Sequence, residues 1–495
     1  MRKTKIIATL GPASNTEEII RELILAGVNV LRFNFSHGDY EEHLSRLRIV
    51  EKLREEMNMP IATLLDTKGP EVRLGKFEGG RAILQAGETF TLTAEDVIGT
   101  SARASVSYNK LPEDVKPGNC ILLDDGLIEL EVLSVQGSEI LTRVKNGGVI
   151  SDRKGVNIPG VFLSMPYLNK KDEEDIVFGI QHGFDIIAAS FVRCADDVLQ
   201  IRKILDKHGN DTIRIIAKIE NADGVNNSEE IIRVSDGIMV ARGDMGVEIP
   251  LEEVPVLQKK LIRKGYLAGK QVITATQMLD SMMTHPRPTR AESTDVANAI
   301  YDGTSAIMLS GETAAGKYPV EAVTTMARIA RRAERDIDYK KRFFTNAARE
   351  TDDVTGAISH ATCTTAYDLN AAAIITITKS GQTARMVSRY RPDMPIIGCA
   401  MDDKVLRQMN LSWGVSPVKL EEQTSTDALF THAVEEVSKA GLVKNGDVVV
   451  ITAGIPLGMS GTTNMIKVHI VGDVLVKGKG INNLCSCANL CVAKN

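Results

Sequence analysis

The feature that most constrains this chain is a repeated unit, a short apolar segment ending in polar or small residues and followed by a helical stretch. Eight such segments occur, at residues 4–10, 28–36, 61–67, 184–191, 213–220, 237–243, 271–277 and 305–312. Repeated strand–helix units build parallel sheets. Eight of them predict an α/β fold with a closed (β/α)8 TIM barrel.

The spacing and composition of these segments agree with a barrel. Seven intervals have room for one crossover helix, including 16–26, 39–57 and 196–207, and the last begins with aspartates that suit a helix N-terminus. Aromatic residues are few, with 11 Phe, 9 Tyr and 1 Trp. The core must therefore rest on aliphatic side chains, as buried parallel strands do.

The interval between the third and fourth segments has a different texture. Alternating runs at 90–93, 119–123, 128–132 and 140–144 are divided by glycine turns, a pattern typical of a small β-domain. We expect it to span residues 71–166 and to divide the barrel into 1–70 and 167–345. Such an insertion leaves the barrel on the face where active sites lie, so it is placed to act as a lid.

A second α/β region follows the barrel. Residues 372–378, 394–399 and 447–453 read as strands, and 384–391 and 426–440 as helices. They predict a C-terminal α/β domain over 346–473. At about 150 residues per domain, the length of the chain allows two to four domains, which agrees with this division. The tail at 474–495, with cysteines at 485, 487 and 491, has no obvious partner in the chain.

Charge and hydropathy exclude several classes of protein. Lys and Arg number 59 and Asp and Glu 64, a net charge of −5, which argues against binding to nucleic acid. No apolar run approaches the length of a membrane span or of a signal sequence. Seven scattered cysteines suggest reduced thiols. We expect a cytoplasmic protein that binds no membrane.

Charged residues gather where the strands end, which is where parallel barrels place catalytic groups. Lys218 and Glu220 are two residues apart, so both can enter the barrel mouth. Asp244 follows the next strand, and two carboxylates from neighbouring strand ends can hold Mg²⁺ while leaving positions for water and phosphate. The alternative interpretation is a buried Lys–Glu–Asp ion network.

Further strand ends point to anions and to a second cation. Arg32 offers a planar fork for phosphate, and residues 242–246 form a glycine-bearing turn whose N–H groups can receive an anion. Together they suggest a phosphorylated acid as substrate, although solvated arginines and Gly–Asp turns are common. A second set of oxygen-bearing residues carries one formal charge in all: Asn34, Ser36, Asp66 and Thr67. Such a set suits a weakly charged cation. The alternative interpretation is that these side chains cap the strand ends.

Two other motifs do not carry their usual chemistry. Residues 311–318 nearly spell a phosphate-binding P-loop, but Tyr318 replaces the metal-binding hydroxyl and Pro319 follows. The histidines and the C-terminal cysteines lack the spacing of zinc ligands. We therefore expect neither a P-loop nor a zinc site.

Nine ordered motifs resemble the pyruvate kinase family, of bacterial type. They lie at residues 4–12, 31–38, 65–73, 154–160, 217–224, 238–250, 276–282, 286–298 and 307–313. The resemblance covers about residues 1 to 473. It implies the barrel, an inserted β-barrel lid and a C-terminal regulatory domain, with transfer of a phosphoryl group from phosphoenolpyruvate to ADP, giving pyruvate and ATP.

The resemblance also assigns roles position by position. It implies that Lys218 stabilises the transition state, that Arg32 contacts the phosphoryl group, and that Gly243, Asp244 and Thr276 bind phosphoenolpyruvate. It implies Mg²⁺ or Mn²⁺ on Glu220 and Asp244, and K⁺ on Asn34, Ser36, Asp66 and Thr67. For the nucleotide it implies Asn34, Ser36, His37, Arg73 and Lys154. A hydroxyl or relayed water near Thr276 and Ser310 is our candidate proton donor to the enolate.

The resemblance further concerns regulation and ions. Members with lysine at the position of Glu71 are similar to K⁺-independent enzymes, so Glu71 predicts a K⁺ requirement. A phosphate loop for a sugar-phosphate or nucleotide effector is implied at Thr378, Lys379, Ser380, Gly381, Gln382 and Thr383, with Gln382 where arginine is frequent. Residues 286–298 are similar to the subunit-contact segment of homotetramers. Residues 472–480 are similar to the junction with a further phosphohistidine-like domain, so the tail is either its remnant or a truncation.

Two rival functions are weighed against this one. A Mg²⁺-dependent aldolase acting through a pyruvate enolate would share the barrel and the two carboxylates, but it has no use for lid cations on nucleotide phosphates. A non-catalytic sensor of phosphorylated metabolites would share the fold and form no ATP.

Overall fold

The computed structural model of the protein describes residues 2–346, 353–423, 425–456 and 461–472. Its centre is a closed barrel of eight parallel strands in the order β1-β17-β16-β15-β14-β13-β3-β2, which confirms the eight expected segments. Almost every strand residue is buried, because helices cover the outside and side chains fill the inside. The strands are β1 (Lys5–Thr9), β2 (Val30–Asn34), β3 (Ala62–Asp66), β13 (Ile186–Ala189), β14 (Arg214–Ile219), β15 (Gly237–Ala241), β16 (Gln271–Ala275) and β17 (Ala306–Leu309).

Helices surround the barrel. The Thr16, Asp39 and Asn169 side chains each accept a backbone N–H at the start of a helix, which satisfies groups that the helix itself cannot. The helices are α1 (Glu17–Ala26), α2 (Tyr40–Met57), α4 (Lys170–Gln181), α5 (Ala195–Lys207), α6 (Ala222–Asn226), α7 (Ser228–Val234), α8 (Arg242–Glu248), α9 (Val254–Leu267), α10 (Arg290–Asp302), α11 (Gly311–Ala314) and α12 (Pro319–Asp336), with 3₁₀ turns at Pro12–Ser14 and Asp280–Met283.

The lid is an antiparallel-rich sheet between β3 and α4, in the order β4-β12-β8-β9-β10-β6-β7, with a separate pair β11-β5. A bridge between Leu74 and Val106 joins its two ends, so the sheet curls into a small barrel around its own apolar core. Its elements are β4 (Val72–Arg73), a 3₁₀ turn (Glu78–Gly80), β5 (Arg81–Leu84), β6 (Thr89–Thr93), β7 (Arg103–Ser105), α3 (Leu111–Asp114), β8 (Cys120–Leu123), β9 (Ile128–Gln136), β10 (Glu139–Val144), β11 (Gly148–Ser151) and β12 (Gly155–Asn157).

The C-terminal region is a five-stranded sheet in the order β20-β19-β18-β21-β22. The three expected strands are its centre, and the edge strands β20 and β22, with partly exposed residues, escaped the apolar pattern. Its elements are α13 (Tyr339–Asn346), α14 (Val354–Asp368), β18 (Ala373–Ile377), α15 (Gln382–Ser388), β19 (Ile396–Ala400), α16 (Asp403–Met409), β20 (Val415–Lys419), α17 (Thr426–Lys439), β21 (Val448–Gly454) and β22 (Thr463–Ile470).

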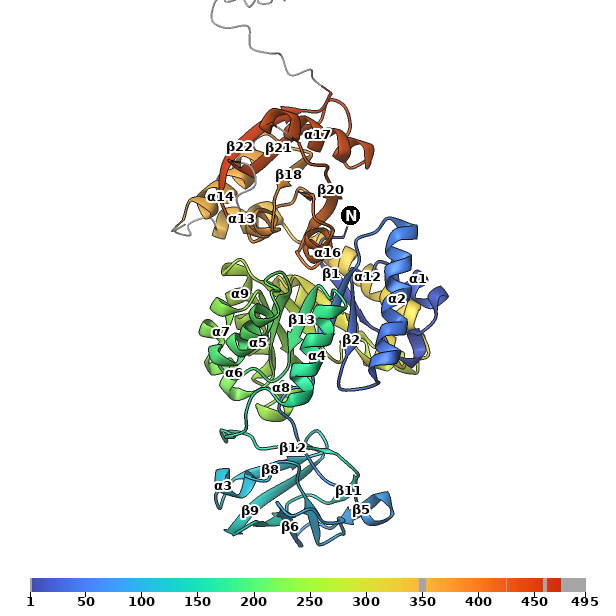
Figure 1. The fold of residues 1–495 in the computed structure, drawn as a ribbon, viewed down its shortest axis with the longest axis vertical. Helices are drawn as coiled ribbons and strands as arrows, with labels where there is room; N and C mark the ends of the chain where they lie inside the picture. Colours follow the sequence, from blue (N-terminus) through green and yellow to red (C-terminus); the bar gives the residue numbers. More distant parts are fainter. Residues whose placement is uncertain (1, 347–352, 424, 457–460, 473–495) are drawn as a thin grey trace, which may run out of the picture.

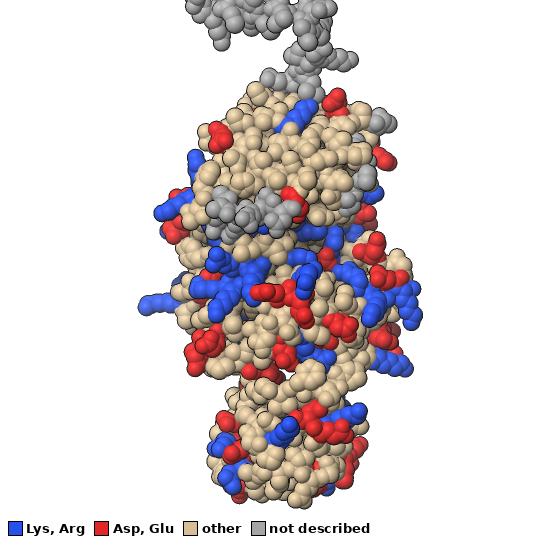
Figure 2. All heavy atoms as spheres, turned by 90° about the vertical axis from the view of Figure 1, so that its left-hand side faces the viewer, with Lys and Arg blue, Asp and Glu red and all other residues tan. Residues whose placement is uncertain are grey.

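The lid and the C-terminal sheet lie at opposite ends of the barrel (Figure 1). Figure 2 shows lysine and arginine side chains gathered in a band where the barrel meets the C-terminal layer. Across the described ranges, none of the helices combines the length and hydropathy that a bilayer crossing requires. The tail at 474–495 and its three cysteines lie outside the described residues, and the domain boundaries given above stay predictions.

Candidate active site

Lys218 is the centre of a charged cluster at the barrel mouth, where β14 ends. Its Nζ lies 3.1 Å from Asp66 Oδ1, 3.0 Å from Glu220 Oε1 and 2.8 Å from Ser190 Oγ. Burial opposes the charge, but the Asp66 and Glu220 carboxylates outweigh it and raise the pKa of Lys218. The ammonium is therefore held in place by three partners, and its carboxylate neighbours favour the charged form.

Asp66, at the end of β3, connects this lysine to Arg32. Arg32 Nε donates to Asp66 Oδ2 at 2.6 Å, and the other end of the guanidinium donates to Thr9 Oγ1 at 3.0 Å. Burial alone would raise the pKa of Asp66, but the charges of Arg32 and Lys218 together lower it. Asp66 therefore orients both cations toward the same mouth.

Glu220 is fully buried. The backbone N–H of Phe191 donates to its Oε2 at 2.5 Å, while Oε1 forms the 3.0 Å ion pair with Lys218 Nζ, without the geometry of a hydrogen bond. Burial, which the Lys218 charge only partly offsets, raises the pKa of Glu220 to about 8. A bound cation would compensate such a carboxylate.

Asp244 is the second carboxylate, on the first turn of α8, close enough to act electrostatically on both Lys218 and Glu220. Across the described residues, no three Asp, Glu, His or Cys side chains gather into a metal cage. A pair of carboxylates fits Mg²⁺, which keeps several waters and takes substrate oxygens as further ligands. The donor set therefore fits the implied ion.

Thr276 and Gly243 meet beside Asp244. Thr276 has φ +70°, and Gln277 follows with φ +53°, a left-handed conformation that is rare for a β-branched residue. This turn aims Thr276 Oγ1 at the Gly243 N–H, which donates to it at 2.7 Å. The Gly243 N–H expected to receive a substrate carboxylate is thus already occupied by the hydroxyl, and the ligand would have to compete for it.

The four residues expected to hold K⁺ lie at the ends of two adjacent strands, β2 and β3, or just after them. Asn34 lies opposite Asp66 in the register of β2 and β3. Asn34 Oδ1 accepts the Ser36 N–H at 3.1 Å, and Thr67 Oγ1 accepts the Ser190 N–H at 3.2 Å. The side-chain oxygens of Asn34, Asp66 and Thr67 therefore already have structural partners, as the capping alternative expects. Their remaining lone pairs can still face an ion. His37, the next expected residue, is exposed.

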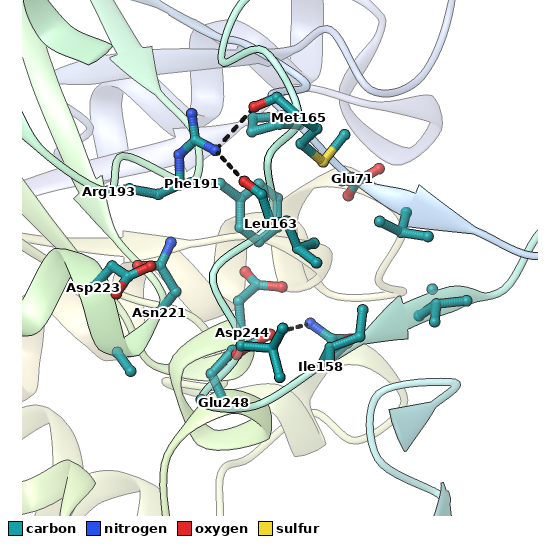
Figure 3. A pocket seen from close by; sticks show the side chains of 18 of the residues that line it. Glu71, Ile158, Leu163, Met165, Phe191, Arg193, Asn221, Asp223, Asp244 and Glu248 are labelled. Atoms are coloured by element: carbon teal, nitrogen blue, oxygen red, sulfur yellow. Dashed lines mark hydrogen bonds between the residues drawn. The ribbon is translucent and has the colours of Figure 1, made fainter. Parts of the chain in front are cut away.

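A cavity of about 390 Å³ lies between this cluster and the lid (Figure 3). Asp244 lines it from the barrel, and Arg73 and Lys154 line it from the lid. Arg73 Nε donates to Glu71 Oε2 at 2.9 Å, and Lys154 Nζ lies 2.8 Å from Asp124 Oδ1. The structure therefore brings two of the five nucleotide candidates, Arg73 and Lys154, to one wall of the cavity. The other three, Asn34, Ser36 and His37, do not line it, and neither do Lys218, Glu220, Arg32 and Thr276 in the barrel mouth.

Two site residues escaped the sequence analysis. Ser190 follows β13 directly, and its hydroxyl oxygen accepts a hydrogen bond from Lys218. The strand-end rule would have found it, because the fourth apolar segment closes on Ser-Phe. Asp124 pairs with Lys154 from a turn with φ +52°. Nothing in the local sequence distinguishes that aspartate from other turn residues.

The expected effector loop lines a second cavity, of about 460 Å³, at the end of β18. Thr378, Lys379, Ser380, Gln382 and Thr383 line it, and Gly381, with φ +77°, turns the chain into α15. Arg214, at the start of β14, donates to the Ser380 carbonyl at 2.9 Å. The strand that ends at the charged cluster around Lys218 therefore begins in contact with this loop.

Comparison with known proteins agrees with this geometry. Residues 1–323 match the family model for the barrel domain of pyruvate kinase, and residues 356–469 match the model for its alpha/beta domain. The chain is 52% identical over 472 residues to a pyruvate kinase of Clostridium acetobutylicum, covering 95% of this chain and 100% of that protein. It is 50% identical to one of Bacillus licheniformis, covering 100% of this chain and 85% of that protein.

A solved structure shares the whole architecture. The crystal structure of a pyruvate kinase from Cryptosporidium parvum superposes with a TM-score of 0.90 at 40% identity, covering 95% of this chain and 96% of that one. Both family models, the curated relatives and the fold thus agree over nearly the whole sequence. The chain belongs to the pyruvate kinase family.

Proposed function

We propose that this enzyme transfers the phosphoryl group of phosphoenolpyruvate to ADP, giving pyruvate and ATP. The observation that carries the proposal is the fixation of Lys218 by Asp66, Glu220 and Ser190 below a cavity whose opposite wall bears Arg73 and Lys154. Phosphoryl transfer needs little covalent help, so positioning and positive charge around the phosphoryl oxygens are what a site must supply.

In this scheme the chain's own residues divide the work. Lys218 and Arg32 contact the phosphoryl oxygens, and Arg73 and Lys154 hold the nucleotide phosphates, with Asn34, Ser36 and His37 at the nucleotide side. The bond from phosphorus to the enol oxygen breaks as a bond to the ADP β-phosphate oxygen forms. The enolate left behind is protonated at carbon, for which Thr276 or Ser310, or a water relayed by them, is the proposed donor.

Two cations complete the proposal. Glu220 and Asp244 would hold Mg²⁺ or Mn²⁺, which when bound would neutralise charge on the phosphoryl and enolate oxygens. Asn34, Ser36, Asp66 and Thr67 would hold K⁺. Glu71, which faces Arg73 on the lid wall, leaves the site without the extra ammonium that a lysine at this position would bring.

The proposal extends to regulation, assembly and location. An anionic effector, a sugar phosphate or a nucleotide, would occupy the cavity at residues 378–383, and the bond from Arg214 to Ser380 supports a connection to β14. A homotetramer with contacts through 286–298 and a cytoplasmic location follow from the family resemblance.

One coupled assay tests the central proposal. Purified protein, Mg²⁺, K⁺, phosphoenolpyruvate and ADP should yield pyruvate and ATP in equal amounts. ATP formation excludes both the sensor and the aldolase. Absence of ATP with all components present, under conditions where the protein is folded, would overturn the assignment.

A further inference from the structure

The lid returns to the barrel through a strap, residues 162–167, which belongs to no helix or strand. Figure 3 shows its carbonyl groups facing a barrel arginine. Arg193 donates from one terminal nitrogen to the carbonyl oxygens of Leu163, at 3.2 Å, and Met165, at 3.0 Å. In an extended chain the carbonyls of residues two apart face the same side, and this arginine takes both.

The residue between them faces the other way. Ser164 donates its N–H to Asp114 Oδ2 at 2.9 Å and its hydroxyl to Asp114 Oδ1 at 2.7 Å. Asp114 ends α3 and belongs to the lid. The strap is therefore held from the barrel side by one charged group and from the lid side by another of opposite sign.

Each of these two groups is itself oriented by a neighbour. Asp197 on α5, whose side chain is 3% exposed, accepts from Arg193 Nε at 3.1 Å and from its second terminal nitrogen at 3.2 Å. On the lid side, the Tyr108 hydroxyl donates to Asp114 Oδ2 at 2.8 Å. Side chains fixed in this way lose little further entropy when they hold a third segment.

We propose that Arg193 and Asp114 clasp residues 163–165 from opposite faces and are positioning residues that set where the lid presents Lys154 and Arg73 to the nucleotide. This inference rests on the proposed function. The barrel half of the clasp moves with β13 and α5, and the lid half moves with α3. A change in lid position must therefore break or re-form hydrogen bonds at residues 163–165.

The clasp is continuous with the catalytic cluster. Arg193 lies two residues after Phe191, whose N–H donates to Glu220, and both residues line the cavity. A second contact between lid and barrel, from Asn157 Nδ2 to Glu248 Oε1 at 2.9 Å, reaches the helix that carries Asp244. The clasp thus lies between the part of the site proposed for phosphoenolpyruvate and the part proposed for ADP.

The test uses the full-length enzyme with Arg193→Ala, Asp114→Ala and the double variant. Each single variant should raise the KM for ADP about tenfold and leave the KM for phosphoenolpyruvate within about twofold, because only the lid wall loses its placement. Since releasing either side frees the strap, the double variant should be little worse than the worse single one. Arg193→Lys should recover part of the loss.

A second readout does not depend on activity. Phe162 is 65% exposed and lies beside the Arg193 guanidinium, so chymotrypsin should cut after it faster once the strap is released. We expect cleavage at least about tenfold faster in both single variants than in the wild type. Arg202→Ala is the matched control, because Arg202, on α5, also pairs with an aspartate and a backbone carbonyl, far from the strap.

Folded variants with wild-type cleavage and wild-type KM for ADP would overturn the clasp. If Arg193→Ala does not fold because Asp197 is left buried and unpaired, Asp114→Ala, whose aspartate lies on the lid surface, decides alone by the same two measurements. If the wild type forms no ATP, the proposed function is refuted. If strap cleavage is nevertheless faster in the variants, Arg193 and Asp114 still hold the strap and so set the position of the lid.

Discussion

The barrel mouth and the lid wall both carry cations, but they hold them in different ways. The Lys218 side chain is 10% exposed and lies among Asp66, Glu220 and Ser190. The Lys154 side chain is 40% exposed and forms an ion pair with Asp124. A buried cation held by several fixed partners is in place before substrate arrives, whereas a half-exposed pair can exchange its partner for a ligand phosphate.

The difference suggests a division of labour. Charges fixed in a low-dielectric floor act on the transition state, because they need no reorganisation when the phosphoryl group moves. In the proposed mechanism, charges on the lid act on binding of the nucleotide. Substitutions in the floor should therefore lower kcat, and substitutions in the lid should raise the KM for ADP.

Lys218→Met tests the difference between the barrel mouth and the lid most strongly. It should lower kcat by at least about 10³-fold, because the developing charge loses its nearest fixed cation. Steady-state kinetics measure the change, and a thermal melt checks that Asp66 and Glu220, left without that cation, still allow folding. Lys264→Met is the control, since that lysine pairs with Glu229 on the outer helices. Near-normal turnover of Lys218→Met would contradict the assignment.

Replacing K⁺ by tetramethylammonium should have the next largest effect. We expect a loss of roughly 10²-fold, because a fixed positive charge is missing from the floor. Glu71→Lys should make the rate far less dependent on K⁺, whereas Glu78→Lys, an exposed lid position, should not. Equal rates of the wild type in both salts would count against the K⁺ site.

Lys154→Ala tests the lid side of the same difference. The KM for ADP should rise about tenfold with a small change in kcat, and the difference from wild type should shrink as ionic strength increases. Lys145→Ala serves as the control, because Lys145 is also a lid lysine paired with a glutamate, Glu131. A fall in kcat as deep as that of Lys218→Met would erase the proposed distinction.

The smallest effect is expected at the far end of the barrel. The double change Lys379→Ala and Ser380→Ala should abolish a shift of about fivefold in the half-saturating concentration of phosphoenolpyruvate, the lower range of allosteric coupling. Titration with a panel of sugar phosphates and nucleotides measures it. An unaltered response to every compound would remove the loop as an effector site.

Much of the fold could be predicted because the informative signals are local. Eight buried parallel strands read as continuous apolar runs, and the central strands β18, β19 and β21 did the same. The strands β20 and β22 lie at the sheet edges and carry partly exposed residues, so their pattern is weak. In the lid the two- to four-residue strands β4, β5, β7, β11 and β12 are too short for alternation to show.

The candidate site also has a part that local sequence signals predict and a part that they do not. Lys218, Glu220 and Asp244 follow from strand ends and from the family motifs, and their gathering at one mouth agrees with that prediction. The occupied Gly243 N–H, the bond from Phe191 to Glu220 and the pair between Lys154 and Asp124 could not be predicted. Each depends on backbone turns with positive φ or on partners about 30 residues apart.

The sequence by itself determined the barrel, the inserted lid and the identity of the charged groups, because hydrophobic periodicity and residue type are properties of neighbouring positions. Only the tertiary structure decided which cations are buried and fixed, which are half-exposed, and that Arg193 and Asp114 meet on one strap. Burial and hydrogen-bond partnership arise between segments that are distant along the chain, so no local pattern encodes them.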